Sequence, residues 1–259
     1  MGEYAEVNGV RLYYEQHGER ASAATPLVLI HGGIGGIEMF GPNIAALARD
    51  RRVIGVDLQG HGRTKDIDRP LRHELMADDI AALIAKLGLS AVDVMGYSLG
   101  GGVALQLAIR HPNVLRRLVV IGRAISKRGY YPEIGAVFDT MGAHTAANMQ
   151  RSPLYRMYPD VDWPALFTKT GEMERRDYNW SADVAKIAAP IMWMYADADM
   201  ITPAHLLEIW SLFGGGERDA GLDGSKRPRA QLAIVPGTTH YNILATTIVA
   251  DLVRPFLDS

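Results

Sequence analysis

A serine lies in a short glycine-containing motif that is typical of a nucleophile. Gly96-Tyr97-Ser98-Leu99-Gly100 fits the pattern G-x-S-x-G, and it lies between an apolar, strand-like run and an apolar segment with helical spacing. In that context a sharp strand-to-helix turn exposes the serine hydroxyl above a sheet, at the positive end of a helix. We therefore predict that Ser98 attacks a carbonyl carbon.

A serine needs a base that takes its proton, and the chain offers four histidines after Ser98: His111, His144, His205 and His240. His111 is about 20 Å away along the helix that Ser98 begins. His144 lies in a helical insertion, and His205 lies early in a helix. His240 follows the last expected strand, at the sheet edge where catalytic groups gather. We predict that His240 is the base.

The base in turn needs an acid that orients it, and two aspartates follow the expected strand 191–195. Asp199 lies nearer the next helix, and we predict that it orients His240. Asp197 is interpreted as an acceptor for turn amides, an ordinary role of a loop aspartate.

Attack on an ester creates an oxyanion, which requires preorganised N–H donors. One predicted donor is the backbone N–H of Leu99, the residue after the nucleophile. The second is expected in the loop that begins His31-Gly32-Gly33, with Gly33 preferred and Ile34 as the second choice. We interpret His31 as a brace for this loop.

Another histidine, His61, lies in the segment Asp57-Leu58-Gln59-Gly60-His61-Gly62-Arg63. No second ligand lies at the spacing that a metal site requires. We interpret the segment as a structural turn and predict no metal site.

Strand-like and helix-like segments alternate around these residues. Short apolar runs that are buried on both faces, separated by helices, predict a parallel sheet with right-handed crossovers. Alternation at Val10, Leu12 and Tyr14 predicts a half-exposed edge strand. The further expected strands are 27–30, 53–56, 92–96, 118–121, 191–195 and 231–235, and the expected helices are 37–49, 75–87, 103–110, 203–213 and 243–257.

The alternation stops at residues 123–189, which contain no strand-like run. Two helices are expected there, at 133–150 and 163–176, with prolines between them. Methionine and tyrosine are frequent in this segment. We therefore predict an α/β core in two parts, 1–122 and 190–259, split by a helical insertion.

Composition narrows the class of protein further. The chain has 259 residues, 48% of them hydrophobic, and a formal net charge of −2, so neither nucleic acid nor a membrane surface is expected as a partner. It has no cysteine, which excludes disulfides and thiolate chemistry. The N-terminus does not look like a signal peptide, and no apolar run approaches the ~20 residues of a transmembrane helix. A cytoplasmic protein is expected.

Taken together, the segments 29–33, 57–63 and 96–101 with Asp199 and His240 resemble the α/β-hydrolase superfamily, in its order and at its spacings. The resemblance implies a mostly parallel eight-stranded sheet flanked by helices, with residues 123–189 as a cap over the active site. It also implies two-step acyl transfer without a cofactor, in which Ser98 forms an acyl-enzyme and water activated by His240 releases the acid.

Within the superfamily, the residues favour the serine esterase and lactonase branch. Epoxide hydrolases and haloalkane dehalogenases carry aspartate where this chain has Ser98. Metal-free haloperoxidases usually have an aromatic residue near the oxyanion loop, where this chain has Gly33. Carbon–carbon bond hydrolases usually have a proline in that loop, and residues 32–36 contain none. We therefore expect a small-molecule ester or lactone as substrate.

Two other functions remain open at this stage. A proline-releasing type of aminopeptidase would bind a substrate ammonium, for which Glu172 and Glu174 are candidates, although both are better interpreted as solvated helix charges. A small-molecule receptor of the same fold would bind a ligand without turnover. The sequence specifies no oligomeric state. The residues predicted to bind substrate are Gly32, Tyr97, Tyr155, Trp163 and Tyr241.

Overall fold

A single sheet organises the protein, and the computed structural model describes it through residues 2–19 and 22–259. The strand order is β1-β2-β4-β3-β5-β6-β7-β8, and all neighbouring pairs are parallel except β1 with β2 and β2 with β4. The mostly parallel eight-stranded sheet is therefore confirmed. Its strands are β1 Gly2–Val7, β2 Val10–His17, β3 Leu27–Ile30, β4 Val53–Asp57, β5 Val92–Tyr97, β6 Leu115–Ile121, β7 Ile191–Ala198 and β8 Ala230–Thr239.

The prediction that the strand containing Val10, Leu12 and Tyr14 forms the sheet edge is wrong. These side chains are buried as the alternation predicts, but β2 pairs with β1 on one side and with β4 on the other. On this side of the sheet the edge strand is β1, and β8 is the other edge. Alternation reports that one face of a strand is covered, whereas edge position depends on which strands pair with it.

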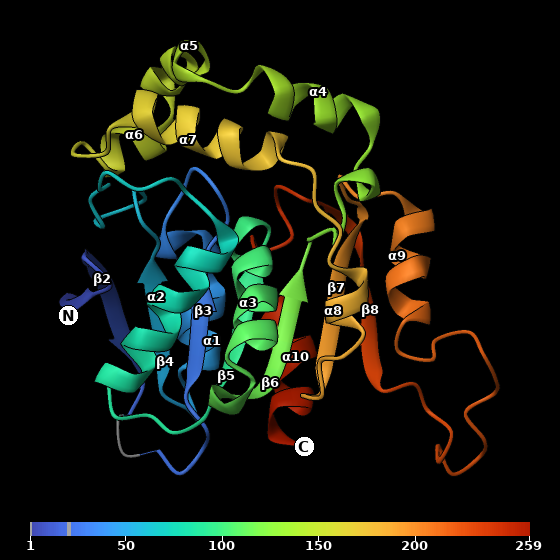
Figure 1. Ribbon diagram of the computed structural model, residues 1–259. Helices are drawn as coiled ribbons and strands as arrows, with labels where there is room; N and C mark the ends of the chain where they lie inside the picture. Colours follow the sequence, from blue (N-terminus) through green and yellow to red (C-terminus); the bar gives the residue numbers. More distant parts are fainter. Residues whose placement is uncertain (1, 20–21) are drawn as a thin grey trace.

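Helices cover both faces of the sheet (Figure 1). Adjacent residues of β3 point to different cores: Val28 and Ile30 belong to one, Leu27 and Leu29 to the other. This period of two explains why the central strands are apolar at every position. The helices of the first core are α2 His73–Lys86, α3 Leu99–Arg110 and α9 Pro203–Ser211, and those of the second are α1 Pro42–Leu47 and α10 Ile248–Asp258.

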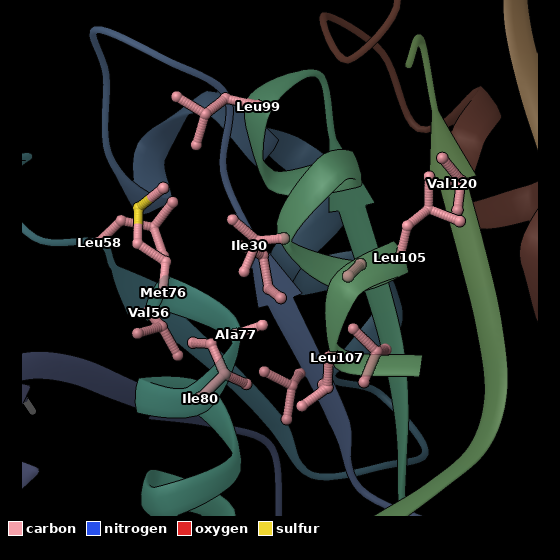
Figure 2. Packing of buried hydrophobic residues seen from close by; sticks show 14 of the residues in the cluster. Ile30, Val56, Leu58, Met76, Ala77, Ile80, Leu99, Leu105, Leu107 and Val120 are labelled. Atoms are coloured by element: carbon pink, nitrogen blue, oxygen red, sulfur yellow. The ribbon is translucent and has the colours of Figure 1, made fainter. Parts of the chain in front are cut away.

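Figure 2 shows the first core where α2 and α3 meet the sheet. Met76 and Ile80 of α2 and Leu107 of α3 pack close to Ile30 and Val56 of the central strands, and all five side chains are almost fully buried. Burying each side chain of this size contributes ~1.5–3 kcal/mol. The packing fixes α3, and with it the turn that carries Ser98.

Residues 123–189 connect β6 to β7 and form helices and loops; no strand is assigned in this described segment, although Ser126 and Tyr130 each make an isolated β-bridge. Helices α4 to α7 lie above the carboxyl ends of the parallel strands, and α8 lies lower, beside β7 (Figure 1). The elements are η3 Lys127–Gly129, α4 Pro132–Thr140, α5 Ala143–Ala146, η4 Ala147–Arg151, α6 Pro153–Met157, α7 Trp163–Arg175 and α8 Ser181–Val184.

The helix expected at 133–150 is interrupted at Met141 and Gly142, which are both extended. The cause is packing against α7. The backbone carbonyl of Met141 accepts a hydrogen bond of 2.9 Å from Arg175 Nη1, and it lies 2.2 Å from where a Cβ on Gly171 would be. The helix expected at 37–49 is likewise divided, into η1 Ile37–Phe40 and α1, at Gly41 with φ +48°.

Across residues 2–19 and 22–259, no helix combines the length and apolar character needed to cross a membrane.

Candidate active site

Ser98 occupies the turn between β5 and α3, with φ 54° and ψ −118°. A non-glycine residue in this region is strained, and such strain is held only where the surroundings fix it. The glycines on either side make the turn feasible. A Cβ on Gly96 would lie 2.2 Å from the carbonyl oxygen of Gly100, and a Cβ on Gly100 would lie 2.1 Å from that of Ile30. The strand-turn-helix context predicted for the motif is thus present.

The three residues predicted to act together are brought together by the fold. His240, which follows β8, has its Nε2 3.0 Å from Ser98 Oγ and its Nδ1 2.8 Å from Asp199 Oδ1. Both the Asp199 and the His240 side chains are about 95% buried. Ser98 Oγ–H can donate to Nε2 while Nδ1–H donates to the carboxylate, which is the arrangement required for a base that accepts the serine proton.

The two loop aspartates have different partners. Asp199 also accepts hydrogen bonds from the backbone N–H groups of Ala196 (3.0 Å) and Met200 (2.8 Å). These two bonds fix the orientation of its carboxylate toward His240. Asp197 is exposed and accepts from the N–H groups of Gly237 (2.8 Å) and Thr238 (3.0 Å), which lower its pKa. Asp197 therefore holds the loop that leads to His240, without contacting the histidine ring itself.

Two residues that support His240 come from neighbouring strands. The Tyr97 hydroxyl donates a hydrogen bond of 2.5 Å to the backbone carbonyl of His240. Gly122, immediately after β6 with φ +59°, lies directly under the ring, because a Cβ there would be 2.9 Å from His240 Nδ1. Sequence analysis missed Gly122. Its position immediately after a buried strand, at the same edge as Ser98, was the available signal.

The predicted oxyanion donors border the same space as Ser98. Gly33 and Leu99 line the cavity above Ser98, and a Cβ on Gly33 would be 3.4 Å from Leu99 Cδ1. Leu99 is the first residue of α3, so its N–H has no acceptor within the helix. Ile34 also lines the cavity and has φ 61°. Both candidates for the second donor, Gly33 and Ile34, therefore remain in place.

Two buried histidines brace the loops around the site. His31 Nδ1–H donates to the Gly32 carbonyl (2.6 Å), and its Nε2 accepts from the Leu58 N–H (3.0 Å). Burial lowers the pKa of His31 to about 4 and that of His61 to about 3, so both are neutral near pH 7. His61 Nδ1 lies 2.8 Å from the Gln59 carbonyl. Both histidines have the structural role that the sequence suggested.

A cavity of about 210 Å³ opens above Ser98 and contains three of the five residues predicted to bind substrate: Gly32, Tyr97 and Tyr241. The predictions for Tyr155 and Trp163 are not supported. Their rings stack on each other with centroids 5.9 Å apart, and neither lines the cavity. The other residues that line it are Gly33, Ile34, Met39, Ser98, Leu99, Arg123, Tyr130, Ile134, Val137, Phe138, Met141, Thr170, Glu174, Met200 and His240.

The cavity wall is mainly apolar but includes a buried ion pair. Arg123 Nη1 donates to Glu174 Oε1 at 3.1 Å, and the two side chains are 2% and 5% exposed. The interpretation of Glu174 as a solvated helix charge is therefore wrong, because the residue lies on the buried face of α7. Glu172, on the same helix, is exposed. Arg123 was missed, although it follows β6 at the same edge as the other site residues.

Comparison with known proteins places the chain in a family with the same type of fold. Residues 25–134 match the family described as alpha/beta hydrolase fold. The chain is 35% identical over 218 residues to a protein of Agrobacterium fabrum named as a carbamate hydrolase, RutD, covering 74% of this chain and 82% of that protein. It is 32% identical over 243 residues to a protein of Haemophilus influenzae named as an esterase/lipase, covering 89% and 82%.

Coverage and fold similarity differ among the matches. The match to a Rhizobium rhizogenes protein, also named as RutD, spans 58% of that protein, which is less than two thirds of its length. Among solved structures, the enol-lactonase from Burkholderia xenovorans LB400 superposes with a TM-score of 0.77 at 24% identity, covering 99% of this chain and 100% of that one. At this identity the likeness concerns the fold.

Proposed function

Because the chain belongs to the α/β-hydrolase family and is a hydrolase, we propose that it cleaves small carboxylic esters or lactones through a covalent acyl-enzyme. The observation that carries the proposal is the hydrogen-bonded chain from Ser98 Oγ through His240 to Asp199, with distances of 3.0 and 2.8 Å, at the wall of a cavity.

In the first step Ser98 Oγ attacks the substrate carbonyl carbon while His240 Nε2 takes the hydroxyl proton. The carbonyl oxygen becomes an oxyanion, which the N–H groups of Leu99 and of Gly33 or Ile34 stabilise. The tetrahedral intermediate collapses to an ester of Ser98, and His240 returns the proton to the leaving alcohol. Asp199 holds the imidazole in the required orientation and stabilises its protonated form.

In the second step water attacks the acyl-Ser98 ester, and His240 Nε2 takes a proton from the water. The oxyanion forms again at the same donors. Collapse of the intermediate releases the carboxylic acid and returns the proton to Ser98 Oγ. A lactone follows the same steps, except that the leaving alcohol stays attached to the acyl group until hydrolysis.

We further propose that residues 123–189 act as a cap that defines the acyl pocket. Tyr130, Phe138, Met141 and Thr170 of this segment line the cavity together with Ser98. The cavity volume of about 210 Å³ is smaller than the ~300–1,000 Å³ of typical drug-sized pockets, which favours a small substrate.

One observation weighs against an aminopeptidase. An ammonium-binding site requires an unpaired carboxylate, but Glu174 is paired with Arg123, and Glu172 is exposed and does not line the cavity. A receptor without turnover would have the same fold and the same hydrogen-bonded residues, so only a measurement of turnover separates it from an enzyme.

The test is hydrolysis of p-nitrophenyl acetate, p-nitrophenyl butyrate and a set of simple lactones by wild-type and Ser98→Ala proteins. We expect turnover by the wild type and loss of at least ~10³-fold in the variant. Full activity in Ser98→Ala would overturn the serine mechanism. Turnover below one per minute on every compound, combined with a ligand-dependent rise in Tm, would favour the receptor.

A further inference from the structure

The segment that carries the proposed second oxyanion donor has few side chains of its own to hold it. Residues 32, 33, 35 and 36 are glycines, and Ile34 between them has φ 61°. A β-branched residue in this region is strained, so its conformation persists only where the surrounding structure fixes it. The position of this segment, which we call the oxyanion loop (residues 32–36), must therefore be set by contacts with its surroundings.

Each end of the oxyanion loop is held by residues at or just after the end of β4. At the start, His31 Nε2 accepts a hydrogen bond of 3.0 Å from the Leu58 N–H. At the end, the Ile37 N–H donates to Asp57 Oδ1 at 2.9 Å. The Asp57 side chain is fully buried, and its Oδ2 accepts from the N–H (2.9 Å) and from Nη1 (3.0 Å) of Arg63. The segment that the sequence marked as a structural turn thus anchors the loop.

A residue of the proposed cap contacts the end of the oxyanion loop. Tyr158 directly follows α6, above the sheet (Figure 1), and its buried hydroxyl donates a hydrogen bond to Glu38 Oε2. The same carboxylate accepts from Arg63 Nη1 at 3.2 Å and from Nη2. A Cβ on Gly36 would lie 2.4 Å from the Tyr158 hydroxyl oxygen and 3.0 Å from Asp57 Oδ1. The hydroxyl therefore packs directly on the last residue of the loop.

The charges in this cluster strengthen the contact between cap and loop. Burial by itself would raise the pKa of Glu38, but hydrogen bonds from Arg63 and Tyr158 lower it below its usual value, so the carboxylate is charged. Burial and then the Glu38 carboxylate raise the pKa of Tyr158, so the phenol keeps its proton. The Arg63 guanidinium lies over the rings of Tyr13 and Tyr158, 4.9 and 5.4 Å from their centroids. A charged acceptor makes the Tyr158 hydrogen bond stronger than one between neutral groups.

A second contact joins the proposed cap to the core through different residues. Lys169 of α7 donates from Nζ to Asp66 Oδ2 (2.5 Å) and to the backbone carbonyls of Ile67 (2.8 Å) and Arg69 (3.0 Å). None of these three acceptors belongs to the oxyanion loop. The two contacts therefore allow an effect of cap attachment to be separated from an effect on the loop.

Resting on the proposed serine mechanism, we propose that Tyr158 is a positioning residue, through which the cap holds the oxyanion loop in the geometry that stabilises the transition state. A donor N–H stabilises an oxyanion only if it points to where that oxygen develops. Tyr158 acts at Gly36 and Glu38, a short way along the chain from the candidate donors Gly33 and Ile34. One contact thus couples the seating of the cap to the completion of the oxyanion site.

The first test is Tyr158→Phe, which removes only the hydroxyl. With p-nitrophenyl acetate and butyrate, kcat and kcat/KM should fall together by ~10-fold while KM stays within about 2-fold, because the lost stabilisation concerns only the transition state. Lys169→Met, which releases the cap contact at Asp66, is the matched control and should keep kcat within about 2-fold of wild type. An unchanged kcat in Tyr158→Phe overturns the inference, and so does an equal fall in Lys169→Met.

A ketone inhibitor tests the oxyanion geometry directly. Propyl trifluoromethyl ketone reacts with Ser98: the Oγ–C bond forms, the carbonyl electron pair becomes an oxyanion at the proposed donors, and the serine proton passes to His240. Its Ki should rise in Tyr158→Phe by the factor by which kcat/KM falls, since the adduct resembles the transition state. In Lys169→Met the Ki should match wild type. An unchanged Ki in Tyr158→Phe contradicts the positioning role.

Glu38→Gln tests the same contact from the core side and covers the case that Tyr158→Phe does not fold. It removes the charge of the acceptor, and kcat should fall about 3- to 10-fold. The double variant Tyr158→Phe/Glu38→Gln should lose no more than about 2-fold beyond the more damaging single variant, because both act through one contact. Losses that multiply in this double variant would show that the two residues act separately, and would overturn the inference.

Hydrogen exchange followed by mass spectrometry measures the loop independently of catalysis. The Ile37 N–H, bonded to Asp57, should exchange at least ~5-fold faster in Tyr158→Phe than in wild type, and at the wild-type rate in Lys169→Met. This result supports the loop contact even if no ester is hydrolysed, an outcome that counts against the proposed function. Unchanged exchange in Tyr158→Phe contradicts the inference even if Ser98-dependent hydrolysis is observed.

Discussion

The Tyr97 hydroxyl and the backbone carbonyl of His240 are joined by a hydrogen bond of 2.5 Å between residues 143 positions apart in the sequence. The Tyr97 ring also lies 5.2 Å from the His240 ring. Burial, followed by the Asp199 and Tyr241 charges, raises the pKa of Tyr97, so the phenol remains a donor. The residue before the proposed nucleophile thus positions the proposed base.

Tyr97→Phe should lower kcat about 10-fold and the free energy of unfolding by ~1 kcal/mol, because the His240 backbone loses its partner while the ring packing is kept. Steady-state kinetics and urea unfolding measure the two effects. Tyr155→Phe, outside the cavity, is the control and should change neither. An unchanged kcat in Tyr97→Phe would show that the bond does not position His240.

Mutation of the two loop aspartates should reduce kcat to very different extents. Asp199→Asn is expected to reduce kcat by ~10³–10⁴-fold, because the amide favours the wrong tautomer of His240. Asp197→Asn should reduce kcat far less, because Asp197 contacts only the Gly237 and Thr238 amides. Measurement of kcat for both variants with a single ester substrate checks this prediction. A larger loss in Asp197→Asn would mean that the wrong acid has been assigned.

Glycine substitutions should have opposite effects in two helices. Gly100→Ala places a Cβ 2.1 Å from the Ile30 carbonyl oxygen and 2.4 Å from that of His31, and should destabilise the protein by about 2–3 kcal/mol or more. Gly135→Ala in α4 meets no atom within 4 Å and should stabilise by about 0.5–1 kcal/mol through helix propensity. Thermal unfolding measures both, and a tolerated Gly100→Ala would contradict the close approach of α3 to β3.

Stability should fall as the pH is lowered from about 6.5 to about 4. An unfolded histidine titrates near pH ~6.5, whereas the folded pKa of His31 is about 4 and that of His61 about 3. Below pH ~6.5 the unfolded chain therefore binds protons that the folded protein excludes, and the loss for His31 amounts to roughly 3 kcal/mol. Both residues give their full stabilisation above this range.

Urea unfolding at pH 7, 6 and 5 checks this expectation. His61→Gln removes one of the titrating groups, so its free energy of unfolding should decrease less between pH 7 and pH 5 than that of the wild type. His144→Gln, at an exposed position, should follow the wild-type pH dependence. Identical pH dependence in all three proteins would show that His61 takes up a proton while folded.

The sequence by itself determined the features that depend on neighbouring residues. Mainly apolar runs of four or five residues identified the central strands because each is buried on both faces. The glycines at 96 and 100 identified the Ser98 turn because only a small residue fits there. Chain order and position after a strand were sufficient to expect His240 and Asp199 close to Ser98, since the carboxyl ends of parallel strands share one edge, and the structure brings the three side chains together.

Tertiary structure decided whatever depends on partners distant in the chain. Pairing with β1 removed β2 from the sheet edge, and close packing of α7 against Met141 interrupted the expected long helix. Glu174 lies on the face of α7 that packs inward, so it is buried against Arg123. Tyr155 and Trp163 stack on each other away from the cavity. Composition cannot distinguish these outcomes, because the burial of a helical side chain depends on which face of its helix packs against the rest of the molecule.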